Sequence, residues 1–262
     1  ARRTSQREAL GVVLILLTSF EWLRSGVTCR VDTILAVSMA GSLLALFSWW
    51  EGGYRGVPWI AILLAGAATL TKGPVGCILP IGIFSLFALL RGGRKELMGI
   101  LVRGFVIAIP VVLLASIWYV LGFLQRGEPF IEKIWYENVA RFTSTMVDKP
   151  HQHSVWYLLG MLFLGLLPWS FLLIVPVVRE KLWQKGVVCS VRSSWSKAEP
   201  LFQYACVVAG CILIFFCIPS SKRSVYLLPA YPFFAIVVYR ILSQFCGERS
   251  CAVTIVSRII FG

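Results

Sequence analysis

The sequence predicts an all-α, polytopic transmembrane protein with about eight to nine spans. Of its 262 residues, 58% are hydrophobic and only 14% are charged, whereas a soluble domain carries about a quarter charged residues. The apolar residues gather in runs, and roughly 20 such residues let a helix cross about 30 Å of hydrocarbon. Helices are the expected form because backbone groups in lipid must be paired within the segment.

The apolar runs also define the expected organisation of the chain. We predict one transmembrane domain over 1–262, with an extracytoplasmic loop at 125–154 inserted between spans. Because the first residue is Ala and the last apolar run, from about 252, stops at Gly262, we expect an internal fragment of a longer protein. The eight earlier spans are predicted at 9–23, 33–50, 57–71, 74–90, 104–124, 155–178, 201–218 and 225–245.

The net charge of +13 is interpreted through membrane topology, because no nucleic-acid-binding motif accompanies it. With a cytoplasmic N-terminus, fifteen Lys and Arg residues face the cytoplasm and nine face the opposite side, as the positive-inside rule requires. This orientation collects polar residues from four separate places on the extracytoplasmic face. They are Asp32, Lys72, the loop 125–154 and the turn 219–224.

Two basic motifs on that face are candidates for binding a phosphate. Thr71-Lys72-Gly73-Pro74 joins two spans, and Pro74 suits the first turn of a helix, which would put Lys72 at a helix N-terminus that favours anions. Lys222 and Arg223 follow two serines in the turn before the last complete span. The alternatives are a lysine that snorkels to the interface and an ordinary polar turn with membrane-surface anchors.

The long loop holds the remaining candidates. Glu137 and Arg141 are spaced i and i+4, so they would form a surface salt bridge on a helix, unless Arg141 instead binds a phosphate in bidentate fashion. His151 and His153 are spaced i and i+2, which rules out a helical zinc motif. One of them together with Glu137 could bind a divalent metal, and plain surface histidines are the alternative.

Asp32 and the cysteines are the other groups with possible chemistry. Asp32 opens the span 33–50 and suits a helix N-cap, or it faces the same polar cavity and binds a sugar or positions other groups. The eight cysteines contain no C-x-x-C pair and lie mostly in apolar runs. We therefore predict neither disulfides nor a cysteine metal site.

In order and spacing, these motifs resemble the GT-C glycosyltransferases of the bacterial protein-mannosyltransferase-like and aminoarabinose (lipid A) transferase type. The resemblance covers residue 1 almost to 245. It rests on six motifs: Arg30-Val31-Asp32, Thr71-Lys72-Gly73-Pro74, Glu137-Asn138-x-x-Arg141-Phe142, a histidine before Trp156-Tyr157-Leu158, Gly165-x-x-Pro168-Trp169, and Ser221-Lys222-Arg223-Ser224-Val225-Tyr226-Leu227-Leu228-Pro229.

The resemblance implies a glycosyltransferase of the bacterial inner membrane with an extracytoplasmic active site. It would move a sugar, with inversion, from a polyprenyl-phosphate donor to lipid A, a glycan or a protein. Lys72, Arg141, Lys222 and Arg223 would bind the donor phosphate, and Asp32 and Glu137 would act at the reacting groups. A divalent metal is bound in some members, and here His151 or His153 would be its ligand.

Two departures from the family pattern limit what the resemblance implies. The family's catalytic acid lies in a loop that would precede Ala1, so the fragment alone is expected to be inactive. Many members have Glu-His where this chain has Glu137-Asn138, and asparagine is the poorer metal ligand. The alternatives are a transporter or flippase for a lipid-linked substrate, and a non-catalytic membrane subunit. A transporter would carry ionisable residues deep in its spans.

Overall fold

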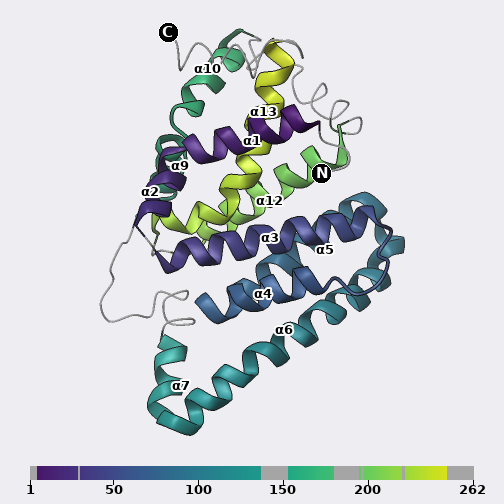
Figure 1. The fold of residues 1–262 in the computed structure, drawn as a ribbon, viewed down its shortest axis with the longest axis vertical. Helices are drawn as coiled ribbons and strands as arrows, with labels where there is room; N and C mark the ends of the chain where they lie inside the picture. The colour runs from purple at the N-terminus through teal and green to yellow at the C-terminus, as the bar shows by residue number, and fades with distance from the viewer. Residues whose placement is uncertain are drawn as a thin grey trace.

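The computed structural model describes residues 5–28, 30–136, 153–179, 195, 198–219 and 222–246, and in these ranges every regular element is a helix. Figure 1 shows helices stacked in layers, with α6 along one edge and α7 at the end of α6. The predicted helical class is confirmed. The helices are α1 (Gln6–Thr18), α2 (Phe20–Val27), α3 (Val31–Glu51), α4 (Trp59–Lys72), α5 (Val75–Gly92), η1 (Arg94–Glu96), α6 (Leu97–Arg126), α7 (Glu128–Trp135), α9 (Val155–Gly165), α10 (Trp169–Arg179), α12 (Pro200–Cys217), η3 (Ser224–Ala230) and α13 (Tyr231–Cys246).

Several of these helices are suited to cross a membrane. Among the described residues, five helical segments are long and apolar enough for a span, and a sixth is counted if the bent pair α1–α2 forms one span. The predicted span 57–71 is the short helix α4, and the predicted span 155–178 is divided into α9 and α10. The total of eight to nine spans stays a prediction, since the run from about 252 lies outside the described residues.

The helices α3 and α4 form the centre of the main core. Together with α5, α6, α12 and α13 they bury a continuous set of side chains that includes Met39, Leu43 and Ile62, all fully buried. Two buried hydroxyl groups in this core donate to backbone carbonyls. Ser42 Oγ donates to Ala61 O at 2.9 Å, and Tyr204 Oη donates to Leu43 O at 2.8 Å. These bonds join α3 to α4 and to α12. They also give hydrogen-bond partners to polar groups that would find none in lipid.

Two broken helices meet at their breaks. The pair α1–α2 bends by 67° at Ser19, and the pair α9–α10 is interrupted at residues 166–168. The backbone N–H of Phe20 donates to Leu167 O at 3.1 Å, and Trp169 Nε1 donates to Thr18 Oγ1 at 2.9 Å. One backbone N–H freed at the first break is therefore paired with a carbonyl at the second, and a bond between side chains joins the breaks as well, which meets the need for paired polar groups in a membrane. The sequence predicts one span over 155–178, and the structure divides it at residues 166–168, within the Gly165-x-x-Pro168-Trp169 motif.

At the end of the bundle predicted to face the cytoplasm, one arginine joins three helices. Arg240 of α13 forms ion pairs with Glu8 of α1, at 2.9 Å, and with Glu199, which immediately precedes α12. Glu8 also completes a capping box with Ser5 at the start of α1. The chemistry described below lies at the opposite helix ends.

Candidate functional site: a cationic cavity at one end of the helices

The site begins at the tight hairpin between α4 and α5. Gly73 adopts a positive φ of 75°, which an L-residue with a side chain rarely adopts. At Gly76 an added Cβ would lie only 2.3 Å from the carbonyl carbon of Ala68, so α5 approaches the backbone of α4 too closely for any side chain at this position. This approach fixes the end of α4, and with it the position of Lys72.

Lys72 and Asp32 form an ion pair across this end of the bundle. Lys72 is the last residue of α4, and its Nζ bonds Oδ1 of Asp32 in the first turn of α3. The same Nζ lies 4.5 Å from the ring centroid of Tyr226, a cation–π distance. The lysine remains about a third exposed, at 32%, so it keeps a face for a ligand.

Two local expectations, one for Lys72 and one for Asp32, are wrong. Lys72 belongs to the C-terminal turn of α4 rather than to a helix N-terminus, because α4 extends through it before Gly73 turns the chain. Asp32 does not cap its helix, since Arg30 is the N-cap residue of α3 and the Asp32 carboxylate bonds Lys72 instead. Their ion pair does place Asp32 and Lys72 at the same end of the bundle, as the topology predicts, and a shared site stays a prediction.

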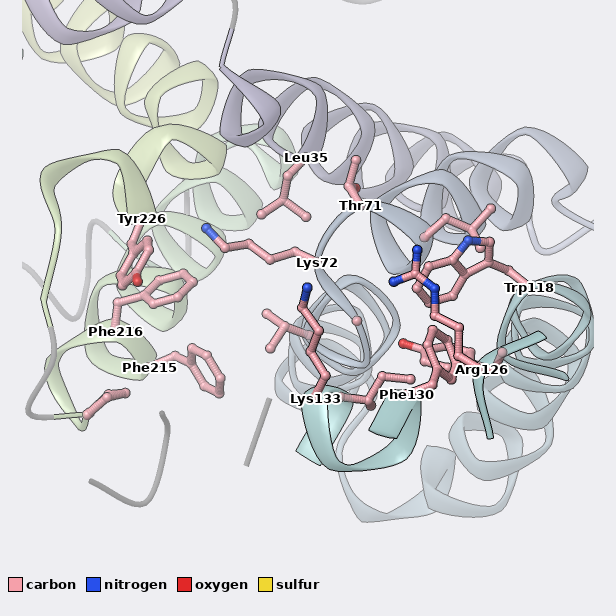
Figure 2. A pocket seen from close by; sticks show the side chains of 16 residues that line it. Leu35, Thr71, Lys72, Trp118, Arg126, Phe130, Lys133, Phe215, Phe216 and Tyr226 are labelled. Carbon is pink, nitrogen blue, oxygen red and sulfur yellow. The ribbon is translucent and has the colours of Figure 1, made fainter. Parts of the chain in front are cut away.

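Beside the pair lies a cavity of about 500 Å³. Figure 2 shows Lys72, Lys133 and Arg126 extending toward this space from separate elements. Arg126 ends α6 and Lys133 belongs to α7. The other lining residues are mostly apolar or aromatic: Leu35, Leu70, Thr71, Gly73, Val75, Trp118, Tyr119, Phe130, Ile134, Phe215, Phe216, Pro219 and Tyr226.

The electrostatics of the cavity favour an anion attached to an apolar group. None of the described lining residues carries a carboxylate. Lys72 is partly neutralised by Asp32, whereas Arg126 and Lys133 form no ion pair within the described part of the chain. Three cations over an apolar, aromatic lining suit a phosphate on a hydrocarbon chain. Arg126 and Lys133 lie in the predicted loop 125–154, and the sequence predicts no role for either of them.

A glycine positions the wall that carries Lys133. The ring of Phe130, on α7, occupies the space beside Gly122 of α6, where an added Cβ would lie 2.2 Å from the ring. We expect the Gly122→Leu variant to displace Phe130 and α7, and so to weaken ligand binding in the cavity about tenfold. Gly160→Leu, where the Cβ meets nothing within 4 Å, is the control. Equal ligand affinity in the two variants would show that the position of α7 does not depend on the space beside Gly122.

The turn at 219–224 contacts the cavity in a way that differs from expectation. Lys222 is buried, with 5% of its surface exposed, and its Nζ donates to Pro219 O at 2.6 Å. Arg223 is exposed and precedes η3. The cavity is instead lined from this region by Pro219 and Tyr226. A phosphate-binding role for Lys222 and Arg223 stays a prediction.

The predicted metal ligands are only partly described. His153 is exposed and its ring stacks on Tyr157, with centroids 4.0 Å apart. Glu137, Arg141 and His151 lie outside the described residues. Within the described ranges, no group of three His, Cys, Asp or Glu side chains could hold a metal ion. Those residues alone thus provide no ligand set, and a metal at this place stays a prediction.

A buried carboxylate lies next to the site and was missed from the sequence. Glu21 of α2 is 1% exposed, forms an ion pair with Arg24 at 2.7 Å, and accepts a bond from Ser224 Oγ at 3.0 Å. An added Cβ at Gly165 would lie 2.9 Å from Glu21 Cβ and 1.8 Å from Tyr231 Oη. The only sequence signal was an acidic and a basic residue spaced i, i+3 at the edge of an apolar run.

No protein-family model matches the chain, but individual proteins are similar to it in sequence. It is 30% identical over 174 residues to the undecaprenyl phosphate-alpha-4-amino-4-deoxy-L-arabinose arabinosyl transferase of Yersinia enterocolitica, covering 64% of this chain and 27% of that protein. The enzyme of that name from Edwardsiella ictaluri is 26% identical over 265 residues, covering 97% of this chain and 44% of the relative.

Solved structures show the same fold. Crystal structures of ArnT from Cupriavidus metallidurans, bound to undecaprenyl phosphate and in the apo state, superpose with TM-scores of 0.68 and 0.67 at 23% and 22% identity. The matches cover 97% and 98% of this chain and 44% and 45% of those chains. The chain therefore spans less than half the length of these relatives. Its helices form part of a multi-pass membrane fold.

Proposed function

We propose that this chain, which belongs to the GT-C family of the aminoarabinose transferases, supplies the donor-phosphate site of a glycosyltransferase. The enzyme would move a sugar from an undecaprenyl-phosphate carrier to lipid A, at the extracytoplasmic face of the bacterial inner membrane. The observation that carries the proposal is the apolar cavity bordered by Lys72, Arg126 and Lys133. The relative of known structure whose fold it shares has undecaprenyl phosphate bound.

The reaction assigns a clear task to these cations. A nucleophilic oxygen of the acceptor attacks the anomeric carbon, the bond from that carbon to the phosphate oxygen breaks, and undecaprenyl phosphate leaves with the bonding electron pair. Negative charge grows on the phosphate in the transition state. Fixed cations beside it lower the barrier because they need no reorganisation when the charge develops.

The remaining predicted residues extend this site. Asp32 holds Lys72 in place through their ion pair, and its second oxygen can accept a bond from a sugar hydroxyl or amine. Glu137, Arg141, Lys222 and Arg223 keep their predicted roles at the reacting groups and the phosphate. A divalent metal, with His151 or His153 as ligand, remains part of the proposal, and no step above depends on it.

A transporter or flippase for the same lipid is the rival function. Transport would use ionisable groups deep in the spans, whereas the cations of the cavity lie at helix ends. One buried acid, Glu21, is the observation that favours the rival. Chemical analysis of the product separates the two functions, because a flippase returns the lipid-linked sugar unchanged.

The test is a transfer assay with the purified full-length protein, undecaprenyl-phosphate-linked aminoarabinose and lipid A. We expect sugar on lipid A, and about a tenfold loss in the Arg126→Gln/Lys133→Gln double variant, because bonds to charged groups contribute about 1.5–3 kcal/mol each when well formed and exposure reduces this. Arg94→Gln/Lys95→Gln, exposed at the opposite end of the bundle, is the charge-matched control. Donor that is moved but never cleaved would replace the proposal with the rival.

A further inference from the structure

The buried Glu21 of α2 has no part in the proposed reaction. Its Oε1 bonds both Arg24 and Ser224, whereas its Oε2 is buried and has no hydrogen-bond partner within the described residues. Burying a carboxylate is costly, and an ion pair alone rarely repays the cost. If position 21 served only to pack the helices, an apolar side chain would be more stable there. The two bonds of Oε1 therefore indicate that Glu21 holds other groups in position.

The contact with Ser224 joins α2 to the first residue of η3. Arg24 Nη2 also reaches Ser224 Oγ, at 3.4 Å, so both members of the ion pair hold the same hydroxyl. Apart from the half-exposed Tyr226, the residues of η3 are buried, and Val225, Leu227 and Leu228 pack into one apolar cluster. This polar contact therefore fixes where the apolar segment begins.

The geometry of η3 transmits that position to the cavity. A 3₁₀ helix has three residues per turn, so side chains two positions apart point in directions that differ by about 120°. When Ser224 faces α2, Tyr226 is directed away from it, and its ring lies under Lys72 Nζ at 4.5 Å and against Phe216 at 5.3 Å between centroids. Figure 2 shows Tyr226 and Phe216 together on the side of the cavity toward which Lys72 extends.

We infer that Glu21 is a positioning residue: through Ser224 it sets the rotation of η3 and so places the Tyr226 ring against Lys72. The consequence for donor binding rests on the proposed function, but the placement of Tyr226 does not. Glu21 is not among the described residues that line the cavity, and its carboxylate bonds Arg24 and Ser224. It acts only through the segment that it holds.

The decisive variant is Glu21→Gln, which keeps the shape and one acceptor oxygen but removes the charge that holds Arg24 and Ser224. Ser25→Ala is the matched control, because Ser25 lies one turn further along α2, is equally buried at 1% exposure, and its hydroxyl has no partner within the described residues. Two measurements are made on the full-length protein. One is the ¹⁹F resonance of 3-fluorotyrosine placed at position 226, and the other is the affinity for undecaprenyl phosphate.

We expect Glu21→Gln to move the Tyr226 resonance toward its position in a Lys72→Met variant and to weaken the affinity about tenfold, with the melting temperature of the ligand-free protein nearly unchanged. Ser25→Ala should change neither. Adding Ser224→Ala to Glu21→Gln should have no further effect, since both act on one contact. An unmoved resonance in Glu21→Gln overturns the inference. A wild-type protein that binds no undecaprenyl phosphate overturns the proposed function instead, and the resonance still decides the role of Glu21.

Discussion

The Lys72→Met variant should lose at least about a hundredfold in sugar transfer, the loss expected when one fixed donor to a developing anion is removed. Methionine preserves much of the length and apolar volume of lysine, so the packing of the stem should survive. Lys72 holds a central electrostatic position, because Asp32 orients it from one side and the Tyr226 ring lies beneath its ammonium group. Transfer from the lipid-linked donor by the full-length protein is the measurement.

The effect of Lys72→Met has two components that further variants separate. Removing the lysine also leaves the Asp32 carboxylate, 20% exposed, without its partner and able to repel a donor phosphate. If repulsion dominates, Lys72→Met/Asp32→Asn should recover most of the transfer. If the missing cation dominates, as we expect, the double variant should stay near the level of Lys72→Met. Lys95→Met, exposed at the opposite end, is the charge control, and normal transfer by Lys72→Met would remove Lys72 from the site.

The helical class and one half of the site could be predicted from the sequence because both depend on local patterns. Apolar runs define helices in lipid with little ambiguity, and the charge bias of the loops sets which helix ends lie on one face. That reasoning brought Asp32 and Lys72 together, and the ion pair confirms it. The motif resemblance is confirmed by the sequence and structure comparisons.

The rest of the site depends on tertiary contacts between helices, which no local sequence pattern predicts. Lys133 reaches the cavity because α7 turns back at Gly127 and Phe130 fits beside Gly122. Glu21 and Ser224 are separated by 203 positions in the chain, so their contact follows only from how α2 and η3 pack. A helix cap at Asp32, one of the two roles that the sequence left open, does not form, because the carboxylate bonds Lys72 on another helix.

Gly76→Ala should destabilise the protein strongly, although it adds only one methyl group. The new Cβ would lie 2.3 Å from the carbonyl carbon of Ala68, 2.4 Å from Thr69 N and 2.6 Å from Ala68 O. Overpacking usually costs about 1–3 kcal/mol where side chains can move aside. Here the obstacle is the backbone of α4, a central helix of the core, so we expect about 3 kcal/mol or more.

Gly82→Ala provides the internal control on the same helix. Its Cβ meets nothing within 4 Å, so the substitution should stabilise α5 by about 0.5–1 kcal/mol, the helix preference of alanine over glycine. Thermal unfolding in detergent should therefore place the two variants on opposite sides of the wild type. Gly76→Ala should also impair transfer in whatever fraction folds, because separating α5 from α4 moves Lys72 away from Asp32. If both variants unfold at a higher temperature than the wild type, the hairpin tolerates a side chain at Gly76. The close approach of α5 to α4 would then not be what sets the position of Lys72.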